Sequence, residues 1–219
     1  MRYSNTKTAR FLSRPNRFVA MVSIDGKAEA VHVKNTGRCK ELLIPGSTVV
    51  LTKPGGSARK TSYDLIAVYR DGQLINIDSQ APNKAAKEWL ETQNYDVVKP
   101  EYKYGNSRID FYMKKGMREY LMEVKGCTLE RQGIGYFPDA PTERGVKHLR
   151  ELIGAKKAGY ECAVAFVIQM EGVTEVRANE ETHPEFKDAL EEARAAGVKV
   201  LFLMCKVEKD SLRVVEQRE

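Results

Sequence analysis

The sequence predicts two unlike domains in one chain: an all-β barrel over residues 1–82 and an α/β domain over residues 83–219. Short segments of alternating apolar and polar residues fill the first eighty positions, and helix-forming segments appear only from Asn83 onward. The charge changes at the same place. The first 82 residues hold 13 Lys+Arg and 6 Asp+Glu, a net charge of +7, whereas the remainder hold 23 and 24, a net charge of −1. A length of 219 residues accommodates one large domain or two small ones.

The first domain reads as a series of short strands. Strands are predicted over 17–25, 27–34, 48–53, 64–69 and 73–77, and the turns between them include Asp25-Gly26, Pro45-Gly46 and Asp71-Gly72. Five or six such strands with regular turns favour a small closed barrel. The OB-fold is the familiar barrel of this size that binds nucleic acid, but periodicity alone does not separate it from an SH3-like barrel.

The second domain alternates helices and strands. Asn83 is expected to cap a helix that runs to Glu91, and Thr142 to cap a helix over 142–158. A third helix is predicted over 184–196, with strands over 97–104, 108–114, 119–128, 163–169 and 199–206. This order is typical of an α/β domain whose last strands are joined by crossover helices.

Composition excludes several classes of protein. Hydrophobic residues make up 42% of the chain, which is enough for packed cores, and the longest apolar run, Cys162–Met170, is too short to span a membrane. The N-terminus lacks a signal-peptide pattern, so we expect a cytoplasmic protein that does not associate with membranes. The four cysteines form no paired CxxC spacing, which favours reduced core thiols over a zinc site or a disulfide.

Three charged residues on two strands carry the chemistry. If 108–114 and 119–128 are neighbouring antiparallel strands, Asp110 and Glu123 meet on one side of the sheet, and Lys125 shares the face of Glu123. Two carboxylates suit a hard cation, Mg²⁺ or Mn²⁺, and the backbone carbonyl of Val124 is a further candidate ligand. Lys125 beside the cation can orient a water and neutralise phosphate charge. The alternative is a solvated strand face with a Glu–Lys pair.

The Asp…Glu-x-Lys pattern resembles the PD-(D/E)xK superfamily of nucleases. In such nucleases a glutamate on the preceding helix often joins the site, so the resemblance adds Glu88 as a candidate metal ligand, with Glu91 second.

Longer motifs resemble the sugar fermentation stimulation protein A family. They are Arg14–Phe18, His32–Arg38, Ser107–Phe111, Glu123–Lys125 and the run from Tyr136 to Leu149, which includes Phe-Pro-Asp-Ala-Pro-Thr-Glu-Arg-Gly-Val-Lys-His-Leu. The resemblance covers nearly the whole chain. It implies an N-terminal OB-fold, a PD-(D/E)xK restriction-endonuclease-like α/β domain, DNA binding without strong sequence preference and a link to maltose metabolism.

Basic residues at two places are candidates for nucleic-acid contact. Arg144 and Lys147 crowd a helix start, where backbone N–H groups attract anions, although a plain capping motif is the alternative. In the barrel the candidates surround one turn: Arg14, Arg17, His32, Lys34, Asn35 and Arg38. Nearby aromatic residues are few, which favours phosphate contacts, marked salt dependence and little sequence reading.

Two functions are therefore expected. The first is an enzyme, a Mg²⁺- or Mn²⁺-dependent DNA phosphodiesterase that uses Asp110, Glu123 and Lys125. The second is a non-catalytic DNA-binding regulator of sugar metabolism with an inactive nuclease-like domain. A barrel that contacts RNA or another protein stays open as a third alternative, and so does a homo-oligomer.

Overall fold

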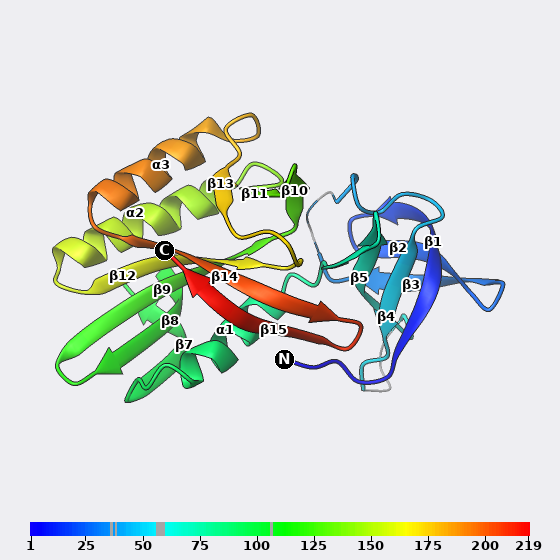
Figure 1. The fold of residues 1–219 in the computed structure, drawn as a ribbon, viewed down its shortest axis with the longest axis horizontal. Coiled ribbons are helices and arrows are strands. Elements are labelled where there is room, and N and C mark those ends of the chain that lie inside the picture. The colour runs from blue at the N-terminus through cyan, green and yellow to red at the C-terminus, as the bar shows by residue number, and fades with distance from the viewer. Residues whose placement is uncertain (36, 38, 56–59, 106) are drawn as a thin grey trace.

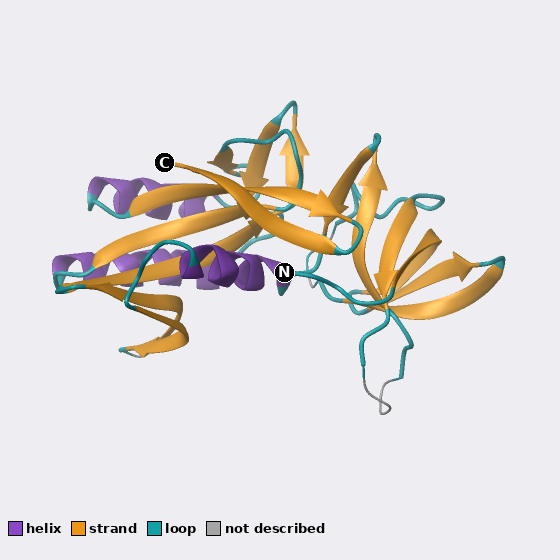
Figure 2. Ribbon diagram, turned by 60° about the horizontal axis from the view of Figure 1, so that its bottom comes forward, coloured by secondary structure: helices purple, strands orange, loops and turns teal. Residues whose placement is uncertain are grey.

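The computed structural model describes residues 1–35, 37, 39–55, 60–105 and 107–219. It divides into a barrel of strands and a layered α/β domain, which lie side by side along the long axis of the molecule (Figures 1 and 2). The predicted fold class is confirmed in both parts.

The barrel consists of β1 to β6. They are β1 (Thr6–Asn16), β2 (Val19–Ile24), β3 (Lys27–Val33), β4 (Thr48–Thr52), β5 (Asp64–Arg70) and β6 (Gln73–Asn76). The strand order is β3-β2-β1-β4-β5-β6, and a parallel pairing of β3 with β5 closes the sheet on itself. Strand β1 was not predicted, because only Ala9 and Phe11 of its eleven residues are buried and its pattern reads as polar.

The second domain is a six-stranded mixed sheet with helices on both faces. Its elements are α1 (Ala81–Glu91), β7 (Val97–Tyr104), β8 (Ser107–Lys115), β9 (Arg118–Cys127), α2 (Glu143–Lys157), β12 (Glu161–Ile168), α3 (Pro184–Ala195), β14 (Lys199–Glu208) and β15 (Ser211–Arg218). The sheet order is β15-β14-β12-β9-β8-β7. Strands β9, β12 and β14 are parallel, and α2 and α3 are the predicted crossovers between them. A small sheet of β10 (Leu129–Arg131), β11 (Ile134–Phe137) and β13 (Val176–Ala178) was not predicted, because its strands have three or four residues.

The two faces of this sheet have separate cores. Helices α2 and α3 pack together over one face and α1 covers part of the other (Figure 1). Leu149, Phe166 and Phe186 belong to the core on the α2 side, whereas Ala85 and Leu90 of α1 pack with the core on the opposite side. The predicted catalytic carboxylates, Asp110 on β8 and Glu123 on β9, lie in the sheet between these two layers of helices.

The end of the barrel is joined to the α/β domain by a buried glutamine. Gln169 follows β12, and its side-chain amide donates hydrogen bonds to the backbone carbonyls of Asn76 (3.0 Å) and Asp78 (3.2 Å) and to the Asn76 side chain (3.0 Å). The predicted boundary between residues 82 and 83 falls in the first turn of α1. The first residues of the chain return to the second domain, where the Met1 ammonium donates to the carbonyl of Leu212 (2.8 Å).

The cysteine prediction is confirmed, since all four thiols are free and buried. Among the described residues, no helix has both the length and the apolar character needed to cross a membrane.

Candidate active site

The site lies where strands β8 and β9 part. Their backbone pairing runs from Lys115 and Arg118 to Phe111 and Met122 and stops there. Next to the end of this pairing, the Asp110 side chain bonds to β9 in place of the backbone: its Oδ2 accepts a hydrogen bond from the backbone N–H of Val124 at 2.8 Å. Beyond this point β9 continues only beside β12. The predicted neighbours Asp110 and Glu123 are thus brought together at an opening in the sheet.

Glu123 is held tightly by two donors. It is 2% exposed, and its Oε1 accepts a hydrogen bond from Lys125 Nζ at 2.7 Å and contacts Nδ1 of His148 on α2. Burial disfavours the charged carboxylate, but the hydrogen bonds from His148 and Lys125 and the charge of Lys125 outweigh it and lower the pKa of Glu123 to about 2. Glu123 is therefore an anion at neutral pH, buried at the base of the site.

Asp110 differs from its neighbour. Its Oδ1 accepts a hydrogen bond from the Asn83 amide at 2.7 Å, from the first turn of α1. Burial and the nearby charge of Glu123 raise the pKa of Asp110, against the opposing effect of its hydrogen bonds and of Lys125. Two carboxylates that repel each other in a buried place are stabilised by a cation between them.

The donor set fits a hard divalent cation. Glu123 Oε2 is buried without a hydrogen-bond partner among the described residues, although buried carboxylate oxygens are normally satisfied. No group of three or more His, Cys, Asp or Glu side chains in the described part of the chain is arranged as a metal site. A cation held by Asp110 and Glu123 would take its other ligands from water, substrate phosphate or backbone, as Mg²⁺ usually does. For Val124 the structure shows a contact through its N–H, and the role of its carbonyl remains a prediction.

A cleft between the two domains leads to this site. It has a volume of about 380 Å³, and its walls include Asn83 and Val124, the two residues that bond to Asp110, as well as Arg17 of the barrel. A second hollow of about 460 Å³ shares Arg17, Gly37 and Ala140 with it and continues past Lys40. The two hollows form a groove that extends from Lys40 on the barrel to Asn83 and Val124 beside Asp110.

Three residues predicted to contact nucleic acid hold the barrel loop together instead. The guanidinium of Arg14 donates to the backbone carbonyls of Gly37 (2.9 Å), Asn35 (2.6 Å) and Arg17 (2.8 Å). Lys34 Nζ lies 2.8 Å from Asp78, which is fully buried, and the Asn35 amide donates to the carbonyl of Ile77. Arg14, Lys34 and Asn35 thus have internal partners, and their contact with nucleic acid stays a prediction.

The other predicted contacts are differently placed. His32 Nδ1 lies 3.1 Å from Asp64 across the pairing that closes the barrel, so it too has a structural partner. Arg17 is exposed and lines both hollows, and Lys147 is exposed, 3.7 Å from Glu151. Arg144 is exposed on the first turn of α2 and donates to His148. Arg38 lies outside the described residues.

The helix residue that reaches the carboxylates is not the predicted one. Glu88 is ion-paired with the Met1 ammonium at 2.5 Å, and 56% of its side chain is exposed. Asn83 was expected to cap α1, but the N-cap is Gln80, and the Asn83 side chain turns to Asp110. Glu88 thus has another partner in this structure, and its role as a metal ligand stays a prediction.

The comparisons with known proteins decide the family. A family model described as the sugar fermentation stimulation protein RE domain matches residues 80–211, and one described as the SfsA N-terminal OB domain matches residues 12–77. The chain belongs to the sugar fermentation stimulation protein family. The barrel is therefore an OB domain, and the second domain is the RE domain of the family.

Relatives of this family match over nearly the full chain. A sugar fermentation stimulation protein homolog of Desulfitobacterium hafniense is 54% identical over 97% of this chain and 94% of its own length. A homolog of Clostridium beijerinckii is 50% identical over 98% and 96%. The structure of Pyrococcus furiosus SfsA in complex with Ca²⁺ is similar with a TM-score of 0.86 at 29% identity, and the match covers 98% of this chain and 96% of that one.

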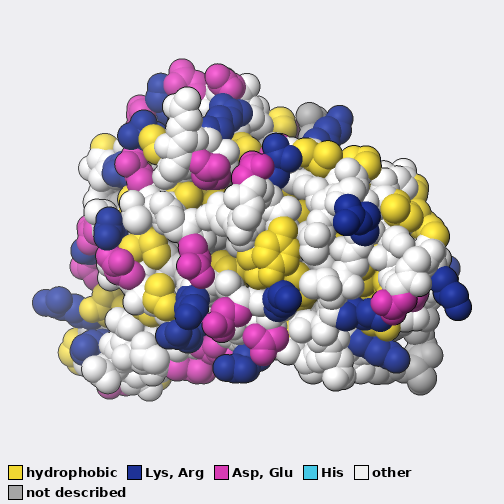
Figure 3. Space-filling model, turned by 45° about the vertical axis from the view of Figure 1, so that its right-hand side comes forward, with side chains coloured by type: hydrophobic (Ala, Val, Ile, Leu, Met, Phe, Trp, Pro, Cys, Tyr) yellow, Lys and Arg dark blue, Asp and Glu magenta, His cyan; other side chains and the backbone are white. Residues whose placement is uncertain are grey.

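The surface of the OB domain is more basic than that of the RE domain. On the face shown in Figure 3, Lys and Arg side chains are spread over the barrel with few acidic neighbours, whereas both signs mix over the other domain. This agrees with the charge difference read from the sequence.

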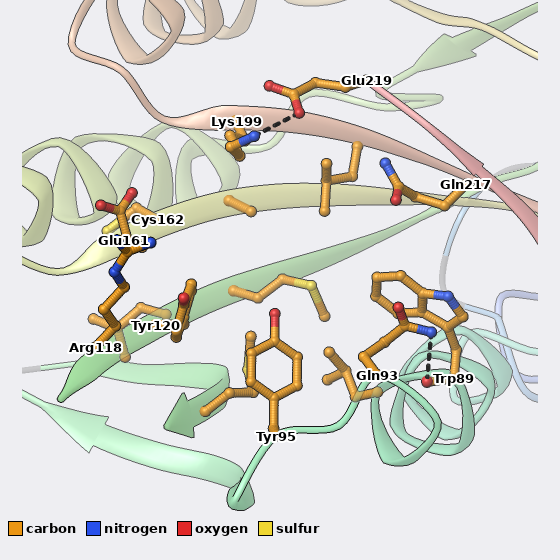
Figure 4. Close-up of a pocket in the computed structure, with 16 residues that line it drawn as sticks. Trp89, Gln93, Tyr95, Arg118, Tyr120, Glu161, Cys162, Lys199, Gln217 and Glu219 are labelled. Carbon is orange, nitrogen blue, oxygen red and sulfur yellow. Dashed lines mark hydrogen bonds and ion pairs between the residues drawn. The ribbon is translucent and has the colours of Figure 1, made fainter. Parts of the chain in front are cut away.

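A further cavity of the RE domain lies away from the carboxylates. Its volume is about 430 Å³, and its walls carry the aromatic side chains of Trp89, Tyr95 and Tyr120 (Figure 4). At its rim Lys199 and Glu219 form an ion pair of 2.7 Å. It opens at the amino ends of the parallel strands. Its walls include neither the three predicted catalytic residues nor Asn83 and Val124, the residues that bond to Asp110, so we do not assign the reaction to it.

Sequence reasoning missed the partners of the carboxylates. His148 is 25 positions from Glu123, and its place in a polar helix start indicated only a general source of charge. Nothing in the local sequence distinguishes Asn83 as a partner of Asp110 from Asn83 as a helix cap. The sequence offered one signal for His148, namely its position one helical turn after Arg144.

Proposed function

We propose that this protein binds DNA with little sequence preference and hydrolyses its phosphodiester bonds with the help of a divalent cation. The observation that carries the proposal is the buried carboxylate of Glu123, whose Oε2 lacks a partner among the described residues. It lies near Asp110, which is bonded to Asn83 and Val124 in the wall of the interdomain groove. The Ca²⁺ complex of the Pyrococcus relative supports a hard cation, since Ca²⁺ and Mg²⁺ both prefer oxygen ligands.

The residues of the chain have distinct tasks in this reaction. Asp110 and Glu123 would hold the cation, which when bound supplies charge neutralisation at the phosphate and activates water. Lys125 is 12% exposed in its side chain and bonded to Glu123, so its ammonium is fixed where it can donate to a phosphate oxygen or to the attacking water. Water adds to phosphorus and one P–O bond breaks, which leaves a phosphate on one product and a hydroxyl on the other.

Arg17 and Arg144 suit the flanking phosphates. Both are exposed, one on the barrel side of the groove and one on the first turn of α2. An exposed guanidinium attracts any phosphate regardless of base, which accounts for weak sequence preference.

The test is cleavage of single- and double-stranded DNA in Mg²⁺ or Mn²⁺. We expect cleavage by the wild type, a loss of at least about 100-fold in Glu123→Gln because a preorganised charge is removed, and unchanged cleavage by the matched control Glu216→Gln. Glu216 is exposed on β15, where it pairs with Arg218. Failure of the wild type to cleave with either metal, or full activity of Glu123→Gln, would refute the catalytic part.

The second candidate is a non-catalytic DNA-binding regulator, favoured by the net charge of +7 over residues 1–82. It predicts salt-sensitive DNA affinity in chelator and no cleavage in metal. The remaining alternative is a barrel that contacts RNA or another protein. Competition between RNA and DNA for the same site distinguishes it from a DNA-binding barrel.

A further inference from the structure

A buried chain of hydrogen bonds runs behind Glu123. Oε1 of Glu123 contacts Nδ1 of His148, and Nε2 of the same ring lies 3.3 Å from Nε of Arg144. His148 is 5% exposed and Glu123 is 2% exposed. Arg144 and His148 stand one turn apart on α2, so the helix itself aligns them.

The directions of these bonds follow from chemistry. A guanidinium has only donors, so Nε2 of His148 must accept from Arg144. An imidazole nitrogen that accepts a hydrogen bond carries no proton, and the single ring proton is therefore on Nδ1. That N–H then donates to the Glu123 carboxylate, and the bonds run in one direction from Arg144 through His148 to Glu123.

We propose that His148, which donates from Nδ1 to Glu123 and accepts at Nε2 from Arg144, is the positioning residue that fixes Glu123 for cation binding. This inference rests on the proposed function for its cation but not for its tautomer. Oε1 already has two donors, His148 and Lys125, which set the plane of the carboxylate. The other oxygen is left buried without a described partner, and this is the oxygen offered to the cation.

Arg144 links this arrangement to the substrate. The side chain is exposed, and only its Nε makes a hydrogen bond within the described residues. Its η nitrogens can therefore bind a phosphate while Nε still holds the ring. One arginine thus serves both substrate contact and the orientation of Glu123.

The tautomer is tested first, in metal-free protein, so that the result does not depend on any cation. Nitrogen-15 spectra of the histidine rings, assigned with His148→Asn, should show a protonated Nδ1 and an unprotonated Nε2 for His148. Arg144→Met should shift the Nε2 signal, because Nε2 loses its donor, while Nδ1 stays protonated, because the Glu123 carboxylate accepts only from a protonated Nδ1. A wild-type His148 with the proton on Nε2, or spectra unaffected by Arg144→Met, would overturn the inference.

The positioning role is tested by calorimetric titration with Ca²⁺ alone. His148→Gln places its amide donor where Nε2 was, and we expect it to weaken Ca²⁺ binding by about 10- to 100-fold, the usual cost of losing a ligand's hydrogen-bond partner. His148→Asn places an amide donor where Nδ1 was and should recover most of this loss. Equal, wild-type-like binding by both variants would overturn the positioning role.

The two arms separate the failure of this inference from the failure of the proposed function. If the wild type does not bind Ca²⁺, the cation site fails, and the spectra alone decide the tautomer. If His148→Gln does not fold, Arg144→Met in the same titration takes its place, with a weakened affinity expected and an unchanged affinity contradicting the role.

Discussion

The side chain of Gln169 makes three hydrogen bonds across the joint between the two domains. Replacing it with Met keeps the length and apolar volume but removes three hydrogen bonds, of 3.0, 3.0 and 3.2 Å, to the end of the barrel. At about 0.5–1.5 kcal/mol each, these bonds predict a loss of about 2–4 kcal/mol in the free energy of unfolding. Gln169 is 2% exposed, so water cannot replace its partners without opening the joint.

The assay is urea unfolding followed by two probes. The single tryptophan, Trp89 on α1, reports the RE domain, and far-ultraviolet circular dichroism reports the whole chain. The matched control is Gln93→Met, which should change stability by less than about 0.5 kcal/mol, because Gln93 is exposed and its amide donates to the Trp89 carbonyl one turn away and to the hydroxyl of the adjacent Thr92. A loss below about 1 kcal/mol in Gln169→Met would refute the view that this side chain holds the joint.

Four further changes test the other assignments. The pKa of Glu123 in the folded protein is lowered to about 2, so the ionised carboxylate stabilises the fold fully above its unfolded pKa, and this stabilisation is lost as the pH falls toward 2. In the presence of chelator, the difference in unfolding free energy between wild type and Glu123→Gln should therefore shrink by up to about 3 kcal/mol between about pH 6 and pH 2. A difference that stays constant with pH would contradict the lowered pKa. Arg17→Ala should reduce the slope of log affinity for DNA against log salt by about 1, and an unchanged slope would remove Arg17 from the interface. Lys34→Met should cost about 3–5 kcal/mol in the free energy of unfolding measured in urea, because it removes the ion-pair partner of the buried Asp78 carboxylate. A stable variant with weakened DNA binding would instead support DNA contact by Lys34. Thr142→Ala should cost about 1 kcal/mol in the same assay, because the Thr142 hydroxyl accepts from the Gly145 N–H at the start of α2, and no loss would show that the cap is dispensable.

Local patterns predicted the elements that carry a strong period. The ranges predicted from the sequence, 119–128 and 142–158, agree with β9 and α2 to within one residue at each end. The polar strand β1 and the short strands β10, β11 and β13 were missed, because their burial comes from neighbours that the local sequence does not name.

The same distinction explains the site. Asp110, Glu123 and Lys125 were predicted because strand geometry alone places them together. The internal partners of Arg14 and Lys34 were not predicted, because a basic residue in a sequence does not reveal whether a buried acceptor lies beside it. The contact of His148 with Glu123 could not be predicted, because it depends on the packing of α2 over β9.

The most direct measurement is a crystal structure of the protein with Mn²⁺, read by anomalous scattering. The proposed site predicts a single strong peak within about 2.0–2.3 Å of Glu123 Oε2 and of an Asp110 carboxylate oxygen. The peak should disappear in Glu123→Gln. A cleft without a peak at these carboxylates, or a peak that Glu123→Gln leaves in place, would contradict the proposal that these residues form a cation-dependent active site.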